Sequence, residues 1–151
     1  MILLDTNVVS EPMRSKPDQN VLAWLDAQAA ESLYLTTISL AELLLGIASL
    51  PTGKRRKALA AALEKQIVAL FGERIVPFDI NGAETYPEIV TRARRHGHSI
   101  AVADAQIAAI AASRQFSVAT RDEAPFQAAG VPIINPWTAT PDAEPPVQSR
   151  T

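Results

Sequence analysis

The stretch Ile2-Leu3-Leu4-Asp5-Thr6-Asn7 decides the fold class of this chain. Its three apolar residues are followed by Asp, Thr and Asn, which all cap helices well, so it predicts a buried strand that leads directly into a helix. Similar signals elsewhere in the chain predict further strands at 33–37, 75–78, 117–119 and 131–135. They also predict helices at 21–28, 40–50, 54–71, 83–96 and 102–114. Short strands that alternate with helices predict an α/β fold, with a central parallel sheet of about five strands flanked by helices on both faces. Pro77 makes 75–78 a candidate edge strand, because proline cannot donate to a sheet ladder.

The composition is that of an ordinary globular domain. The chain has 151 residues, 48% of them apolar, and no cysteine, which excludes disulfides and a thiolate zinc site. We expect one domain over residues 1–137 and a disordered tail over 138–151, because the tail has three prolines and few apolar residues. Neither a signal peptide nor a membrane span is expected, since Asp5 interrupts the first apolar run and no run approaches ~20 apolar residues.

The net charge of −2 means that the protein as a whole does not attract nucleic acid. Binding of RNA would therefore need local basic patches or bound cations. Two basic runs, at 54–57 and 92–95, could contact RNA phosphates, although a solvated helix face is the simpler explanation of each.

Four of the 16 acidic residues lie in or beside apolar runs, where an unpaired charge is costly. Asp5 and Asp122 each follow a predicted strand, whereas Glu42 and Asp104 each fall in the first turn of a predicted helix. Strand C-ends and helix N-termini share one edge of a parallel α/β sheet, so we expect these four side chains to converge there. Most of the other acidic residues, Glu11 among them, lie in polar stretches and are expected to be solvated.

Four carboxylates at one place repel one another, since two of them ~4 Å apart repel by ~4 kcal/mol at an effective dielectric constant of about 20. Such a cluster needs a cation, and ligands that are all oxygen suit Mg²⁺ or Mn²⁺ rather than zinc. Each acid also has a purely structural interpretation. Asp5 could cap a helix, and Glu42 could complete a capping box with Ser39 at the helix N-cap. Asp104 could be favoured by the helix dipole, and Asp122 could be a turn residue.

The four acids lie in segments that resemble, in order and spacing, the motifs of PIN domains. The segments are Leu3-Leu4-Asp5-Thr6-Asn7-Val8, Ser39-Leu40-Ala41-Glu42-Leu43, Ala103-Asp104-Ala105-Gln106-Ile107-Ala108-Ala109, and Ala119-Thr120-Arg121-Asp122 followed by Phe126 and by Ile134-Asn135-Pro136-Trp137. The resemblance covers residues 1 to 137. Within the family the chain looks like the VapC toxins, and especially their FitB-like branch. Many VapC chains carry Asn at the position of Asp122, so the assignment of this fourth acid depends on the branch.

The resemblance implies a cytoplasmic, homodimeric endoribonuclease that is the toxin of a type II toxin–antitoxin module. It implies that Asp5, Glu42, Asp104 and Asp122 hold Mg²⁺ or Mn²⁺ and catalyse hydrolysis of RNA. Four neighbouring residues could orient these acids by hydrogen bonds, namely Thr6, Asn7, Ser39 and Thr120. The implied partner is a small VapB- or FitA-like antitoxin, through which alone the toxin would meet DNA. No membrane is implied.

Two other interpretations stay open. A haloacid-dehalogenase-like phosphatase wants Asp-x-Asp after its first strand, but the second position here is Asn7, and a receiver-like protein would need Asp79 as a phosphate acceptor, for which it is poorly placed. The chain could also be a PIN fold that survives as an inactive binding or scaffold module. Such a module would usually have lost an acid, and this chain keeps all four.

Overall fold

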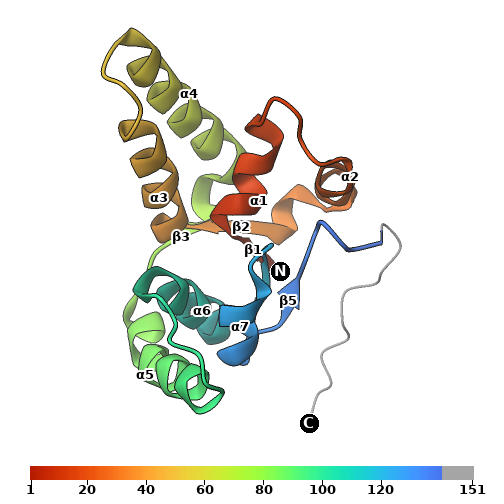
Figure 1. The fold of residues 1–151 in the computed structure, drawn as a ribbon, viewed down its shortest axis with the longest axis vertical. Coiled ribbons are helices and arrows are strands. Elements are labelled where there is room, and N and C mark those ends of the chain that lie inside the picture. Colours follow the sequence, from red (N-terminus) through yellow and green to blue (C-terminus); the bar gives the residue numbers. More distant parts are fainter. Residues whose placement is uncertain (141–151) are drawn as a thin grey trace.

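The structure, a computed structural model, describes residues 1–140, and its centre is one parallel sheet of five strands in the order β3-β2-β1-β4-β5 (Figure 1). The strands are β1 (Ile2–Leu4), β2 (Leu33–Thr36), β3 (Ile75–Val76), β4 (Ser117–Ala119) and β5 (Ile133–Ile134). The predicted α/β class and the predicted edge position of the strand that contains Ile75 are both confirmed.

Helices cover both faces of the sheet, α1 to α4 on one face and α5 to α7 on the other (Figure 1). The α-helices are α1 (Thr6–Ser10), α2 (Gln19–Ala27), α3 (Thr37–Ala48), α4 (Lys54–Phe71), α5 (Ile80–Arg95), α6 (Val102–Arg114) and α7 (Glu123–Ala128). Three short 3₁₀ turns are η1 (Glu11–Met13), η2 (Ala30–Ser32) and η3 (Gly72–Arg74). The α3–α4 hairpin projects away from the sheet (Figure 1).

Alternation along each strand builds two separate cores. In β1, Leu3 packs against α5, α6 and α7, whereas Ile2 and Leu4 pack against α1 to α4. In β4, Val118 belongs to the core beneath α5 to α7, and Ala119 belongs to the core beneath α1 to α4. Successive side chains of a strand point to opposite faces, so a strand that is apolar at every position must be covered on both sides.

The third helix begins earlier than the sequence predicted. Its N-cap is Thr36, whose Oγ1 accepts a hydrogen bond from the Ser39 amide at 3.0 Å. Because β2 ends in extended backbone at Thr36, the strand itself supplies the cap, and Ser39 lies inside the helix. The predicted capping box of Ser39 and Glu42 is therefore wrong, and Glu42 lies beyond the first turn of α3.

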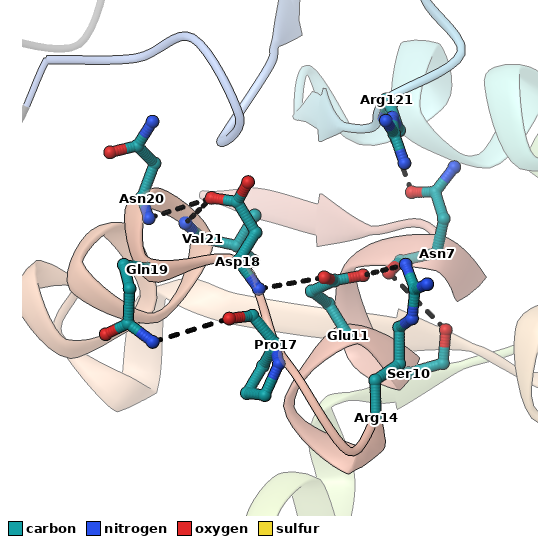
Figure 2. Close-up of polar contacts among 10 residues, drawn as sticks. All are labelled: Asn7, Ser10, Glu11, Arg14, Pro17, Asp18, Gln19, Asn20, Val21 and Arg121. Atoms are coloured by element: carbon teal, nitrogen blue, oxygen red, sulfur yellow. Dashed lines mark hydrogen bonds and ion pairs between the residues drawn. The ribbon is translucent and has the colours of Figure 1, made fainter.

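Glu11 is buried rather than solvated, which corrects the expectation from its polar surroundings in the sequence. Its side chain is 4% exposed in η1. Oε1 accepts a hydrogen bond from the Asp18 amide at 2.9 Å, and Oε2 lies 3.4 Å from the Arg14 guanidinium (Figure 2). The carboxylate thus ties the first helical segment to the start of α2. Local polarity in the sequence cannot reveal such a contact, because it depends on how the chain folds back.

The chain after the last strand turns back onto the core. The amides of Thr138 and Ala139 donate to the carbonyl of Asn135, and Pro136 is fully buried. Most of the tail predicted for 138–151 lies outside the described residues. Among residues 1–140, no helix is both long enough and apolar enough to cross a membrane.

Gly130 should not tolerate a side chain. Its φ of +76° is a left-handed conformation, and an added Cβ would lie 2.6 Å from Nη1 of Arg92. Gly130→Ala should lower the free energy of unfolding by about 1–2 kcal/mol in urea titrations, because L-residues are strained there and Arg92 must move. Gly46→Ala is the matched control: Gly46 lies inside α3 with open space around it, so this change should stabilise the protein by up to about 1 kcal/mol. Changes of the same sign in both variants would contradict this account.

Candidate active site

The four sequence-predicted acids come from the two central strands and from two helices that pack beside them. Asp5 follows β1, and Asp122 lies three residues beyond the end of β4, the strand paired with β1. Asp104 is in the first turn of α6, as expected, whereas Glu42 is in the second turn of α3. Asp5 is 7% exposed, Glu42 and Asp104 are half-buried, and Asp122 is exposed.

Asp5 is the buried centre of the site, and hydrogen bonds hold both of its carboxylate oxygens. Oδ1 accepts from the amide of Thr6 at 2.8 Å, and Oδ2 accepts from the hydroxyl of Thr120 at 2.8 Å. The amide of Asp5 donates to the carbonyl of Ala119 at 2.9 Å, which continues the β1–β4 pairing. The carboxylate therefore has one orientation, set by two neighbouring strand ends.

Two threonine hydroxyls link the acids to one another. Thr6 donates from Oγ1 to Oε2 of Glu42 at 2.7 Å, which joins α1 to α3. Thr120, which bonds Asp5, also accepts from the amide of Asp122 at 3.0 Å. The sequence predicted that both threonines orient acids, and in the structure the Thr6 hydroxyl bonds the carboxylate of Glu42 and the Thr120 hydroxyl bonds that of Asp5.

The other two predicted orienting residues lie differently. Asn7 accepts from the amide of Arg121 at 3.3 Å through Oδ1, so it steadies the loop after β4 rather than a carboxylate (Figure 2). Ser39 is fully buried, and its hydrogen-bond partner is Thr36. Thr36 is a buried polar residue that the sequence analysis missed, although a Thr three residues before a Ser at a strand end is a recognisable cap signal.

The electrostatics of the site show that the four acids affect one another. Burial raises the pKa of Asp5 above its ordinary value, the charges of Glu42 and Asp122 raise it further, and the hydrogen bonds from Thr120 and Thr6 oppose the rise. Burial likewise raises the pKa of Asp104 to about 6, with further contributions from the charges of Asp5, Asp122 and Glu42. His98 opposes this rise, which gives that residue a place beside the site that the sequence did not suggest.

The donor chemistry of the site fits a hard divalent cation. The four carboxylates offer only oxygen, and their mutual repulsion is what a cation would relieve. Within residues 1–140, no three acidic, imidazole or thiolate side chains already stand as a group that could hold a metal ion. The charges of these acids thus affect one another. In addition, Oδ2 of Asp5 accepts a hydrogen bond from the Thr120 hydroxyl, and Oε2 of Glu42 accepts one from the Thr6 hydroxyl.

The hydroxyl of Thr120 should contribute to stability through both of its hydrogen bonds. Thr120→Val removes the donor to Asp5 and the acceptor for Asp122 at a fully buried position. We expect the free energy of unfolding to fall by about 1–3 kcal/mol, because a buried charged group loses its partner. Thr120→Ser keeps the hydroxyl and should lose less. A larger loss in Thr120→Ser than in Thr120→Val would show that the methyl group, and not the hydroxyl, is what matters.

Metal-free protein should lose stability as pH rises through the acid range. The folded pKa of Asp104 is about 6 against 3.8 for the free side chain, so the folded state binds more protons between these values and the stability contribution is lost above pH 6. In chelator, Asp104→Asn should therefore raise the urea midpoint at pH 7.5 but not at pH 3.5. Glu64→Gln, an exposed change on α4, should leave both midpoints nearly unaltered. A variant Asp104→Asn that is less stable than the parent at pH 7.5 would contradict this.

Comparisons with known proteins agree with the fold and with the motifs. The PIN domain family model matches residues 2–131. The VapC ribonuclease Y4jK of Sinorhizobium fredii is 47% identical over 137 residues, which cover 91% of this chain and 98% of that protein. The toxin FitB of Neisseria gonorrhoeae is 50% identical, over 91% of this chain and 99% of its own. A solved structure of FitAB bound to an IR36 DNA fragment superposes with a TM-score of 0.87 at 47% identity, over 93% of this chain and 98% of that chain. The five-stranded sheet, the four acidic segments in order and these matches together show that the chain belongs to the PIN domain family.

Proposed function

We propose that this chain is a divalent-metal-dependent endoribonuclease and the toxin of a type II toxin–antitoxin module. The observation that carries the proposal is the buried Asp5 at the end of β1, linked through Thr120 to Asp122 after the adjacent β4, with Glu42 and Asp104 on helices of the same site. Parallel α/β sheets bind their ligands at this edge. Support also comes from relatives that are named a VapC ribonuclease and a toxin and that match almost over their full lengths.

The proposed metal ligands and catalytic residues are Asp5, Glu42, Asp104 and Asp122. Bound among them, Mg²⁺ or Mn²⁺ would lower the pKa of a water and stabilise charge on the attacked phosphate. Thr120 and Thr6 hold Asp5 and Glu42 in fixed orientations, so little reorganisation is needed when substrate arrives. Asn7 holds the loop that carries Asp122, and Ser39 supports α3 from within.

The proposed macromolecular partners are an RNA substrate, a small VapB- or FitA-like antitoxin and a second copy of the chain. The similarity to a FitAB structure bound to DNA supports an assembly in which the antitoxin mediates DNA contact. We place the protein in the cytoplasm, where RNA and the antitoxin are found. The proposed functional unit is the domain over 1–137, to which Thr138 and Ala139 are joined by hydrogen bonds to Asn135.

A catalytically inactive PIN-fold binding module is the alternative. It would keep the fold and the antitoxin contact without the chemistry. Nothing in the acidic site favours it: all four acids are present, and hydrogen bonds orient Asp5 and Glu42.

Cleavage of RNA should need both the divalent ion and Asp5. Purified protein should cleave a mixed single-stranded RNA in the presence of Mg²⁺ or Mn²⁺, and this cleavage should stop when a chelator is added. Asp5→Asn should lower the rate by about a hundredfold or more, because changes around metal ligands already cost about 10- to 100-fold. Gel analysis of end-labelled RNA measures both effects.

Glu64→Gln is the matched control, since it removes one carboxylate from the exposed face of α4. It should cleave like the parent protein. If correctly folded parent protein cleaves no RNA with either metal, or if Asp5→Asn retains full activity, the proposed chemistry is wrong and the inactive module gains support.

A further inference from the structure

Arg121 is an exposed cation whose backbone is anchored at the acidic site. It lies between Thr120, which bonds Asp5, and Asp122. Its amide donates to Oδ1 of Asn7 at 3.3 Å, which ties the loop after β4 to the start of α1 (Figure 2). The position of this residue at the rim of the site is therefore set by the same elements that position the acids.

An aromatic ring from the end of the domain holds the guanidinium. Cζ of Arg121 lies 5.2 Å from the ring centroid of Trp137. Trp137 is itself fixed: its amide donates to Oδ1 of Asn135 at 3.0 Å, its carbonyl accepts from Nδ2 of Asn20 at 3.1 Å, and its ring packs against the α1–α4 core. A guanidinium held over a ring is restricted in motion but keeps its charge, because the ring carries none.

The charge of Arg121 is not used inside the described part of the chain. Three other arginines there are paired with carboxylates: Arg14 with Glu11, Arg92 with Glu88 and Arg114 with Asp79. Arg121 forms no ion pair with residues 1–140, and its charge does not appear among the causes that lower the pKa of Asp5 or Asp104. A fixed, exposed and unneutralised cation at the rim of an acidic site is suited to bind an anion that must approach that site.

We propose that Arg121, held in place by Trp137, binds a backbone phosphate of the RNA and so positions the strand at the acidic site. This inference rests on the proposed ribonuclease function. RNA is a polyanion, whereas the protein has a net charge of −2 and gathers four carboxylates at the proposed site. A cation such as Arg121 would reduce this repulsion between the protein and the RNA. Arginine suits this task because its planar set of N–H donors matches phosphate oxygens. Arg121 is a substrate-positioning residue, not a metal ligand.

Salt dependence of RNA binding separates a phosphate contact from a structural one. In an Asp5→Asn background with Mg²⁺, anisotropy of a fluorescent single-stranded RNA of mixed sequence gives Kd over a range of KCl concentrations. Adding Arg121→Gln should raise Kd about 3- to 10-fold and lower the slope of log Kd against log salt by about 0.7, the value for one lost phosphate contact. Arg121→Lys keeps the charge and should keep most of the slope.

Lys65→Gln is the matched control, because Lys65 is an exposed cation on α4 outside both basic runs, and its loss changes the net charge equally. Its Kd should change less than about twofold. Trp137→Phe keeps a ring and should bind better than Trp137→Leu at equal thermal stability, if the ring restrains the guanidinium.

Three outcomes would overturn the inference. If the slope of log Kd against log salt is unchanged in Arg121→Gln, the role of Arg121 is only structural, through its contact with Trp137. An equal loss of affinity in Lys65→Gln would show that the effect comes from net charge alone. If the Asp5→Asn parent binds no RNA, Arg121 has no such role. Failure of the proposed function is recognised separately, because the wild-type chain would then show no metal-dependent cleavage of RNA. If the wild type cleaves RNA but the salt slope is unchanged in Arg121→Gln, only the proposed role of Arg121 is rejected.

Discussion

Repulsion between carboxylates is the constraint on which the rest of this structure depends. Asp5 is almost completely buried at the end of β1, yet Glu42, Asp104 and Asp122 all act on the same region with like charge. The sheet offsets this cost because the apolar strand β1 is buried on both faces. The position of β1 then fixes the position of Asp5, the residue that follows it, although Asp5 is charged. The acids are thus held by the core, and burial, with smaller contributions from neighbouring charges, raises the pKa values of Asp5 and Asp104.

Hydrogen bonds from threonine turn that unfavourable cluster into an ordered one. Thr120 joins the ends of β1 and β4, and Thr6 joins α1 to α3. Each hydroxyl lowers the cost of a buried or half-buried charge without neutralising it, so the carboxylates stay available as ligands. The acids therefore remain charged side by side at a cost in stability, which is a common trade between stability and function at active sites.

The positive charge of the protein is arranged to complement this site without cancelling it. An arginine paired with Asp5 or Asp104 would neutralise the negative charge of that acid. Arg121 instead sits over Trp137, where the neutral ring restrains it and leaves its charge exposed. The loop after β4 thus carries both an acid, Asp122, and an exposed cation restrained by Trp137.

The sequence by itself determined the sheet, the family and the identity of the acids, because short apolar runs, helix caps and ordered motifs are local signals. Tertiary structure alone decided the rest. Thr36 replaced Ser39 as the cap of α3, because the end of β2 imposed extended backbone there, and this moved Glu42 out of the first turn. Glu11 became buried through contacts with Asp18 and Arg14. Arg121 met Trp137, 16 positions away, only because the chain returns through β5. Such contacts join segments that the pattern of residues treats separately, so their energies appear only when the chain has folded.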